Sequence, residues 1–222
     1  MKRLLQKQAA MNGSAANERN LWDEWNAAGG PQYPRDEVVR FFFRRFKDKE
    51  ARAKTRVLDL GCGGGVHTEF LAENGFETMA CDISPKGVMA TEQRLANAKG
   101  KNLRVDAFVS SIEALDLPSA SLDAILSVGV LECTLPGVVE AAMPKIAKLL
   151  RPGGTGFFIF ASGRDYRVGS SQNPYVRRGF TESEVHSIFG ANFAELDINR
   201  VIRTEQNQSI ELNEWMVSAF VK

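Results

Sequence analysis

The sequence is poor in the residues that build disulfide frameworks and zinc clusters. It contains 3 cysteines and 2 histidines in 222 residues, and no pair of cysteines has the spacing Cys-x-x-Cys. An odd number of cysteines without such a motif is typical of a reducing compartment. We therefore expect no bound metal ion and a cytoplasmic location.

Long hydrophobic runs and a strong charge of one sign are also missing. The formal net charge is +1, and no apolar stretch approaches the ~20 residues that span a bilayer. The chain begins with basic residues but only a weak apolar stretch, so a signal peptide is not expected. A nearly neutral chain creates no overall field that attracts phosphate backbones or anionic lipids, so we expect no nucleic-acid or membrane partner.

Apolar segments with strand and helix periodicity alternate along most of the chain. Strands are predicted at 55–60, 76–82, 103–109, 122–128 and 155–161, and helices at 65–74, 85–99 and 137–150. This alternation predicts a three-layer α/β/α fold, a Rossmann-like doubly wound sheet that is mostly parallel. The last strands, 193–203 and 210–221, have no helix between them, which predicts an antiparallel C-terminal hairpin at one edge.

Local signals define several boundaries. Ser84 and Pro85 predict the start of one helix, and Thr181 with Glu184 predicts a capping box at another. Residues 151–154, Arg-Pro-Gly-Gly, are predicted to form a turn before the fifth strand. Residues 1–50 are predicted to be an N-terminal helical arm or lid, and 51–222 the main domain.

Glycine is concentrated between the first predicted strand and its helix, at Gly61, Gly63, Gly64 and Gly65. Glycine adopts positive φ without steric cost, and its missing side chain lets a ligand rest on the main chain. In a parallel sheet this turn lies at the carboxyl ends of the strands, where ligands bind. The loop is therefore a predicted binding site.

The residues around the loop narrow the choice of ligand. A dinucleotide-binding loop would need glycine where Val66 stands, and no phosphate-binding P-loop pattern is present. Asp59 before the turn would repel a pyrophosphate but suits an amino group. Asp82, at the end of the next strand, can accept both hydroxyls of a ribose. The predicted ligand is a nucleoside with a cationic amino-acid tail, which is the shape of S-adenosylmethionine.

Three segments, "VLDLGCGGG", "ACDIS" and "LLRPGGTGFFIF", resemble the motif series of class I S-adenosylmethionine-dependent methyltransferases over about residues 36–161. The resemblance implies an enzyme that methylates a small molecule on O or N, with S-adenosyl-L-methionine as cofactor. The alternative is a protein that binds S-adenosylmethionine without catalysis, as a sensor or partner subunit. We expect a small-molecule substrate and a monomer or homodimer.

The resemblance also implies roles for matching positions. The implied cofactor-binding residues are Asp59, Gly61, Cys62, Gly63, Asp82, Ile83, Ser111, Ile112, Glu113, Ser127, Val128 and Gly129. Ser111 stands where the family usually has an acidic residue, so whether Ser111 or Glu113 contacts adenine stays open. Tyr33, in a loop shaped by glycine and proline, is added as a residue that closes over the cofactor.

The catalytic base is left open among Glu132, His67 and Tyr166. Glu132 lies where many relatives have histidine, and His67 is on the first turn after the glycine loop. Tyr166 belongs to the segment 162–179, which either grips an anionic or hydroxylated acceptor or is a solvated surface loop.

Overall fold

The computed structural model of the protein describes residues 15–98, 102–171, 173–207 and 210–222. The chain divides into two compact units. The first unit holds the described residues up to Lys54 together with Gly61–Ala114. The second unit holds Thr55–Leu60 and Leu115–Lys222. The predicted boundary at residue 50 stays a prediction.

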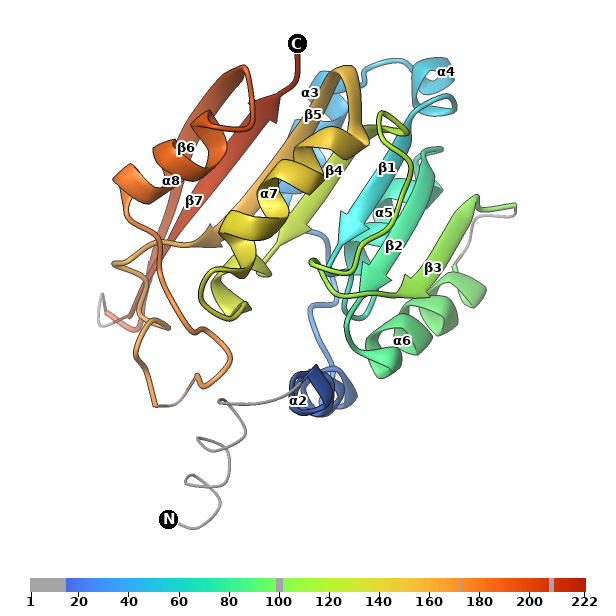
Figure 1. The fold of residues 1–222 in the computed structure, drawn as a ribbon. Coiled ribbons are helices and arrows are strands. Elements are labelled where there is room, and N and C mark those ends of the chain that lie inside the picture. Colours follow the sequence, from blue (N-terminus) through green and yellow to red (C-terminus); the bar gives the residue numbers. More distant parts are fainter. Residues whose placement is uncertain (1–14, 99–101, 172, 208–209) are drawn as a thin grey trace. The chain divides into compact units, whose positions relative to one another are not determined.

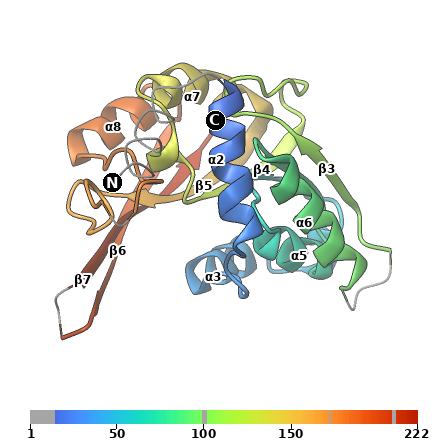
Figure 2. The same cartoon turned by 90° about the horizontal axis from the view of Figure 1, so that it is seen from below.

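The first unit is built on two parallel strands, β2 (Glu77–Asp82) and β3 (Val105–Val109). Helices α5 (Val66–Glu73) and α6 (Pro85–Ala96) pack on β2 and on each other. Helix α2 (Ala15–Ala27) lies along α6, as both ribbon views show (Figures 1 and 2). The N-terminal arm is thus packed against the rest of its unit.

Aromatic rings hold helix α3 (Asp36–Arg45) to the first unit. Phe42 is fully buried and meets Phe76 edge-on, with 5.5 Å between ring centroids. The short helix α4 (Lys49–Arg52) follows, and the Arg52 guanidinium donates to the carbonyls of Asn74, Phe46 and Lys47. Buried rings and the hydrogen bonds from Arg52 to backbone carbonyls therefore fix the segment that leads into the first strand.

The second unit contains five strands. Strand β4 (Leu122–Val128) pairs in parallel with β1 (Arg56–Leu60) on one side and with β5 (Leu150–Ala161) on the other. Strands β6 (Glu195–Glu205) and β7 (Ile210–Phe220) form a long antiparallel hairpin (Figure 1), and β7 also pairs antiparallel with β5. Its helical elements are η1 (Leu131–Cys133), α7 (Val138–Leu149) and α8 (Glu182–Gly190).

The strands have the order β3-β2-β1-β4-β5-β7-β6 in one sheet. This confirms the predicted Rossmann-like α/β fold with a mostly parallel sheet and an antiparallel C-terminal edge hairpin. The predicted caps are also confirmed. The Ser84 hydroxyl accepts a hydrogen bond from Gly87 N, and Thr181 and Glu184 form a reciprocal capping box.

The predicted turn at residues 151–154 is wrong, because β5 already begins at Leu150. The register with β4 shifts there, from Leu122 opposite Leu150 to Ala124 opposite Thr155. The extra residues pair with the end of the chain: Gly153 N donates to Val221 O, and Val221 N donates to Gly154 O, each at 3.1 Å. The glycines thus form an irregularity inside a strand.

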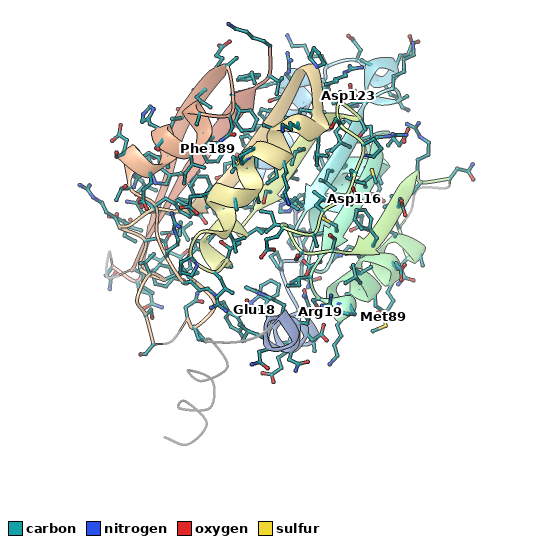
Figure 3. All side chains as sticks on the ribbon, viewed as in Figure 1. Glu18, Arg19, Met89, Asp116, Asp123 and Phe189 are labelled. Atoms are coloured by element: carbon teal, nitrogen blue, oxygen red, sulfur yellow. The ribbon has the colours of Figure 1, made fainter. Side chains whose placement is uncertain are left out.

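The core of the second unit is rich in phenylalanine. Phe189 of α8 is fully buried, and Figure 3 labels it on its helix. Its ring lies 5.1 Å from Phe158 and 5.7 Å from Phe160, both on β5. These contacts fasten α8 to the sheet.

Among the described residues, no helix is both long and apolar enough to cross a bilayer.

We expect Phe189→Ala to lower the free energy of unfolding by about 3–5 kcal/mol, because it leaves a cavity among packed rings. Urea denaturation checks this value. Ile202→Ala is the control, since Ile202 is 57% exposed, and it should change stability by about 0.5 kcal/mol or less. Equal losses from the two variants would contradict the assignment of the core.

Candidate active site

The glycine loop of the first unit is a tight turn held to β2. Gly61, Gly63 and Gly65 have φ angles of 80°, 53° and 76°, in the left-handed region that favours glycine. The backbone N–H groups of Gly61 and Cys62 both donate to Cys81 O, at 2.8 and 3.0 Å. The main chain of the loop is therefore fixed at the carboxyl end of β2.

Asp82 is the last residue of β2, and its carboxylate joins the glycine loop to helix α6. One oxygen accepts from Gly63 N at 2.9 Å, and the other accepts from Ser84 N at 2.8 Å. Burial raises the pKa of Asp82, and the bonds from Ser84 and Gly63 offset only part of that rise. Each oxygen keeps a further lone pair, so the carboxylate can still accept from a ligand.

Gly65 has a structural role instead of a ligand-facing one. A Cβ atom there would stand 2.7 Å from Thr91 Oγ1 and 2.9 Å from Thr91 Cα. The Thr91 hydroxyl also donates to Gly63 O at 2.9 Å. The last glycine of the loop thus lets α5 and α6 approach closely. Gly64, in contrast, has no atom within 4 Å of its Cβ position.

His67 is engaged in a structural contact. Its Nε2 atom accepts a hydrogen bond from the backbone N–H of Arg35 at 3.3 Å. Burial, and then the positive charge of Arg35, lower the pKa of His67 to about 4. The imidazole is therefore neutral at pH 7. Its role as a base stays a prediction, although one ring nitrogen is already in use.

The segment after β3 lies beside Asp82. Ser110 N donates to Asp82 O at 2.9 Å, and the Ser111 hydroxyl accepts from Ala114 N at 3.3 Å. Ile112 is buried, whereas Glu113 is exposed. The Ser111 side chain therefore caps a turn, and Glu113 is the more accessible of the two residues considered for adenine.

Three predicted cofactor residues of the first unit differ in exposure. Cys62 is buried, as expected for a small packing residue, and Ile83 is half-buried next to Asp82. Tyr33 is 83% exposed, so its side chain is almost entirely in solvent. Its closure over a ligand stays a prediction.

The remaining predicted cofactor residues belong to the second unit. Asp59 is buried on β1, opposite Leu126 of β4. Ser127 is buried at the end of β4, and its hydroxyl has no hydrogen-bond partner among the described residues. Val128 is half-buried, and Gly129 has a φ angle of 73° and is exposed. Polar groups thus gather at the carboxyl ends of β1 and β4.

Glu132 belongs to a buried charge cluster that sequence reasoning missed. Its Oε1 atom accepts from Ala161 N at 3.2 Å and lies 4.0 Å from Arg167 Nη2. Arg167 also binds Asp165 and Glu214, with Nε–Oδ1 and Nη2–Oε1 distances of 2.7 Å. We call Glu132, Asp165, Arg167 and Glu214 the Arg167 cluster. One guanidinium therefore faces three carboxylates from three elements.

The charge imbalance changes protonation within the Arg167 cluster. Burial raises the pKa of Glu132 to about 7, with Arg167 lowering it and Glu214 raising it by smaller amounts. For Arg167, burial acts to lower the pKa, but the bond to Asp165 and the nearby carboxylates raise it overall. Arg167 stays charged, and Glu132 exchanges its proton near neutral pH. Tyr166, beside the cluster, is half-exposed.

The segment 162–179 is held by Glu132 as well. The backbone carbonyl of Glu132 accepts from Arg177 N at 2.9 Å and from Arg178 N at 3.2 Å. In this segment the Arg167 guanidinium is occupied by carboxylates. Whether the segment grips an acceptor stays a prediction. Residue spacing gave no signal for the Arg167 cluster, because only the packing of η1, the segment 162–179 and β7 brings its members together.

Comparisons with known proteins agree with this fold. Residues 57–154 match a family model described as a methyltransferase domain. Over 125 residues the chain is 34% identical to the ubiquinone biosynthesis O-methyltransferase of Sinorhizobium medicae (strain WSM419), covering 56% of this chain and 48% of that protein. The chain therefore spans about half the length of the curated relatives it matches.

Solved structures share the architecture. The YcgJ protein from Bacillus has a TM-score of 0.67 at 17% identity, covering 85% of this chain and 99% of that one. The 1,6-didemethyltoxoflavin-N1-methyltransferase of Burkholderia thailandensis has a TM-score of 0.60 at 22% identity, covering 84% and 77%. At these identities the likeness establishes the fold.

We expect Gly65→Ala to destabilise the protein by about 2–4 kcal/mol, because the new methyl group meets Thr91 and the backbone is left-handed. Chemical denaturation measures the loss. Gly64→Ala is the matched control, with open space at its Cβ position, and should cost about 0.5 kcal/mol or less. A Gly65→Ala protein as stable as wild type would show that α5 and α6 do not meet here.

The raised pKa of Glu132 makes stability depend on pH. The folded protein keeps this proton up to about pH 7, whereas the unfolded glutamate loses it near its ordinary pKa of 4.5. Raising the pH through that window therefore lowers the free energy of unfolding. We expect Glu132→Gln to flatten this fall of the free energy of unfolding with pH. The control Glu92→Gln changes an exposed residue on α6 and should leave the fall as it is in wild type. Urea denaturation between about pH 5 and 8 tests this, and an unchanged slope in Glu132→Gln would refute it.

Proposed function

We propose that this chain is a class I S-adenosylmethionine-dependent methyltransferase that transfers the methyl group to a small-molecule acceptor. The match of residues 57–154 to a methyltransferase domain supports this proposal. The observation that carries the proposal is the Asp82 carboxylate, which holds Gly63 N at the end of a parallel strand and keeps acceptor capacity for a ribose. The chain would act as an enzyme of EC 2.1.1 type, with no nucleic-acid or membrane partner.

The donor set of the first unit fits this cofactor. A pyrophosphate needs free N–H groups and positive charge, but Gly61 N, Cys62 N and Gly63 N already donate to a carbonyl or a carboxylate. The bare loop and the acidic side chain suit a nucleoside that carries a positive charge. In our proposal Gly61, Cys62 and Gly63 lie against the methionine part, and Asp82 accepts from the ribose hydroxyls.

The adenine would lie between the residues that follow β2 and β3. Ile83 and Ile112 offer apolar surface, and the Ile112 backbone or the exposed Glu113 can read the ring edge. Ser111 is the weaker choice, because its hydroxyl already accepts from Ala114 N. This assignment follows from the position of the segment, which Ser110 N joins to Asp82 O.

Four further residues are proposed to contact the cofactor. We propose that Asp59 interacts with the cofactor's amino group and that Ser127, Val128 and Gly129 line the methyl-donor side. Tyr33 is retained as a residue that closes over the cofactor. The assembly state is proposed to be a monomer or homodimer, and the location cytoplasmic.

The cofactor supplies an electrophilic methyl group on a sulfonium. The protein's task is alignment of the acceptor, since holding two reactants in line gives effective molarities of ~10^5–10^8 M. An acceptor hydroxyl also needs a base whose pKa lies near the working pH. Glu132 meets that requirement, with a pKa of about 7. Glu132 is fully buried and His67 is already bonded to Arg35 N, whereas Tyr166 is half-exposed. The base is therefore kept open among Glu132, His67 and Tyr166.

The acceptor atom is proposed to be the oxygen of a small hydroxylated molecule. The curated relatives with 34% identity are named as O-methyltransferases, and a hydroxyl is the acceptor for which a base such as Glu132 is most useful. Production of S-adenosylhomocysteine in the presence of phenolic acceptors separates this enzyme from a protein that only binds the cofactor.

We expect Asp82→Asn to weaken S-adenosylmethionine binding by about 10- to 100-fold, because a charged acceptor for two hydroxyls is lost. Isothermal titration calorimetry measures the affinity, and circular dichroism checks the fold. Asp106→Asn, on the exposed side of β3, is the control and should bind as wild type does. Unchanged binding by Asp82→Asn would contradict the proposal that the Asp82 carboxylate accepts from the ribose hydroxyls.

A further inference from the structure

Helix α2 reaches the glycine loop through Trp25 and Asn26, and Asn26 supplies the polar contact. Its Oδ1 atom lies 3.4 Å from the position where a Cβ atom on Gly63 would stand. Its Nδ2 atom lies 2.8 Å from the corresponding position on Gly87, in the first turns of α6. Asn26 therefore fills the space between two glycines. A Cβ atom on Gly87 would clash with its Nδ2 atom, and one on Gly63 would be in van der Waals contact with its Oδ1 atom.

The orientation of the Asn26 amide is fixed by its own helix. Nδ2 donates to the carbonyl of Trp22 at 3.0 Å, one turn earlier. Because only the nitrogen can donate, this bond leaves Oδ1 on the side of Gly63. That oxygen is buried and accepts no hydrogen bond from any residue in the described part of the chain. Buried acceptors without donors are rare in native proteins and call for an explanation.

Helix α2 is held in place by a second side chain, Asp23. Its Oδ1 atom accepts from Ser84 Oγ at 2.5 Å and from Lys86 N at 3.1 Å. Ser84 N in turn donates to Asp82, whose other oxygen holds Gly63 N. A continuous set of hydrogen bonds thus fixes α2 relative to Asp82 and the glycine loop.

We propose that Asn26 Oδ1 accepts a hydrogen bond from the α-ammonium group of S-adenosylmethionine; this inference rests on the proposed function. An amide oxygen can only accept, so it needs a donor from the ligand. The cofactor has three kinds of donor: the ribose hydroxyls, the adenine amino group and the ammonium. We assign the ribose hydroxyls to Asp82 and the adenine amino group to the segment after β3. The ammonium has three N–H donors, so it can donate to Asn26 Oδ1 as well as to Asp59.

The test compares two ligands that differ only at the amino-acid tail. S-adenosylhomocysteine carries the ammonium, whereas 5′-methylthioadenosine is the same kind of thioether nucleoside without it. We expect Asn26→Leu to bind S-adenosylhomocysteine about tenfold more weakly and 5′-methylthioadenosine as well as wild type does. Asn20→Leu, an exposed change on the same helix, should leave both affinities unchanged. Calorimetry measures both affinities for the wild type and for each variant.

The ratio of the two affinities makes the result independent of stability. If Asn26→Leu loosens α2, both ligands lose affinity equally, and so would Asn26→Ala; that outcome would overturn the ammonium contact and leave Asn26 a packing residue. A selective loss for S-adenosylhomocysteine in both variants supports the contact. Wild-type protein that binds neither nucleoside would instead overturn the proposed function, and this inference with it.

Discussion

The organisation of the first unit depends on one carboxylate with two backbone donors. Asp82 ends β2, and its oxygens hold Gly63 N and Ser84 N at 2.9 and 2.8 Å. The strand end, the glycine loop and the start of α6 therefore share a single anchor. Ser84 extends it to Asp23 on α2. A ligand bound at Asp82 would meet a surface whose main chain is already in position, so little ordering would accompany binding.

The two units accommodate buried carboxyl groups in different ways. Asp82 is satisfied by backbone N–H groups, which partly offset the rise in its pKa that burial causes. Glu132 accepts from Ala161 N and shares Arg167 with Asp165 and Glu214. It avoids the cost of a buried charge by keeping its proton up to about pH 7. The first arrangement gives a stable acceptor for hydroxyl groups. The second gives a group that can take up a proton at neutral pH.

Much of the fold could be predicted because its signals are local. Ser84 and the Thr181 capping box mark helix starts through bonds within one turn, and strand periodicity placed β4 at 122–128 as observed. The turn predicted at 151–154 is wrong because glycine and proline allow both a turn and a strand irregularity. Only pairing of Gly153 and Gly154 with Val221, from the far end of the chain, decides between them.

The sequence by itself determined the alternating α/β pattern, the antiparallel hairpin and the glycine loop between Asp59 and Asp82. It could do so because periodicity, caps and glycine act over a few neighbouring positions. Only the tertiary structure decided what the polar side chains do. It placed Asn26 over Gly63 and tied Nε2 of His67 to Arg35 N. It also gathered three carboxylates around Arg167. The physical reason is that burial and charge balance depend on residues from distant parts of the chain, which no local spacing specifies.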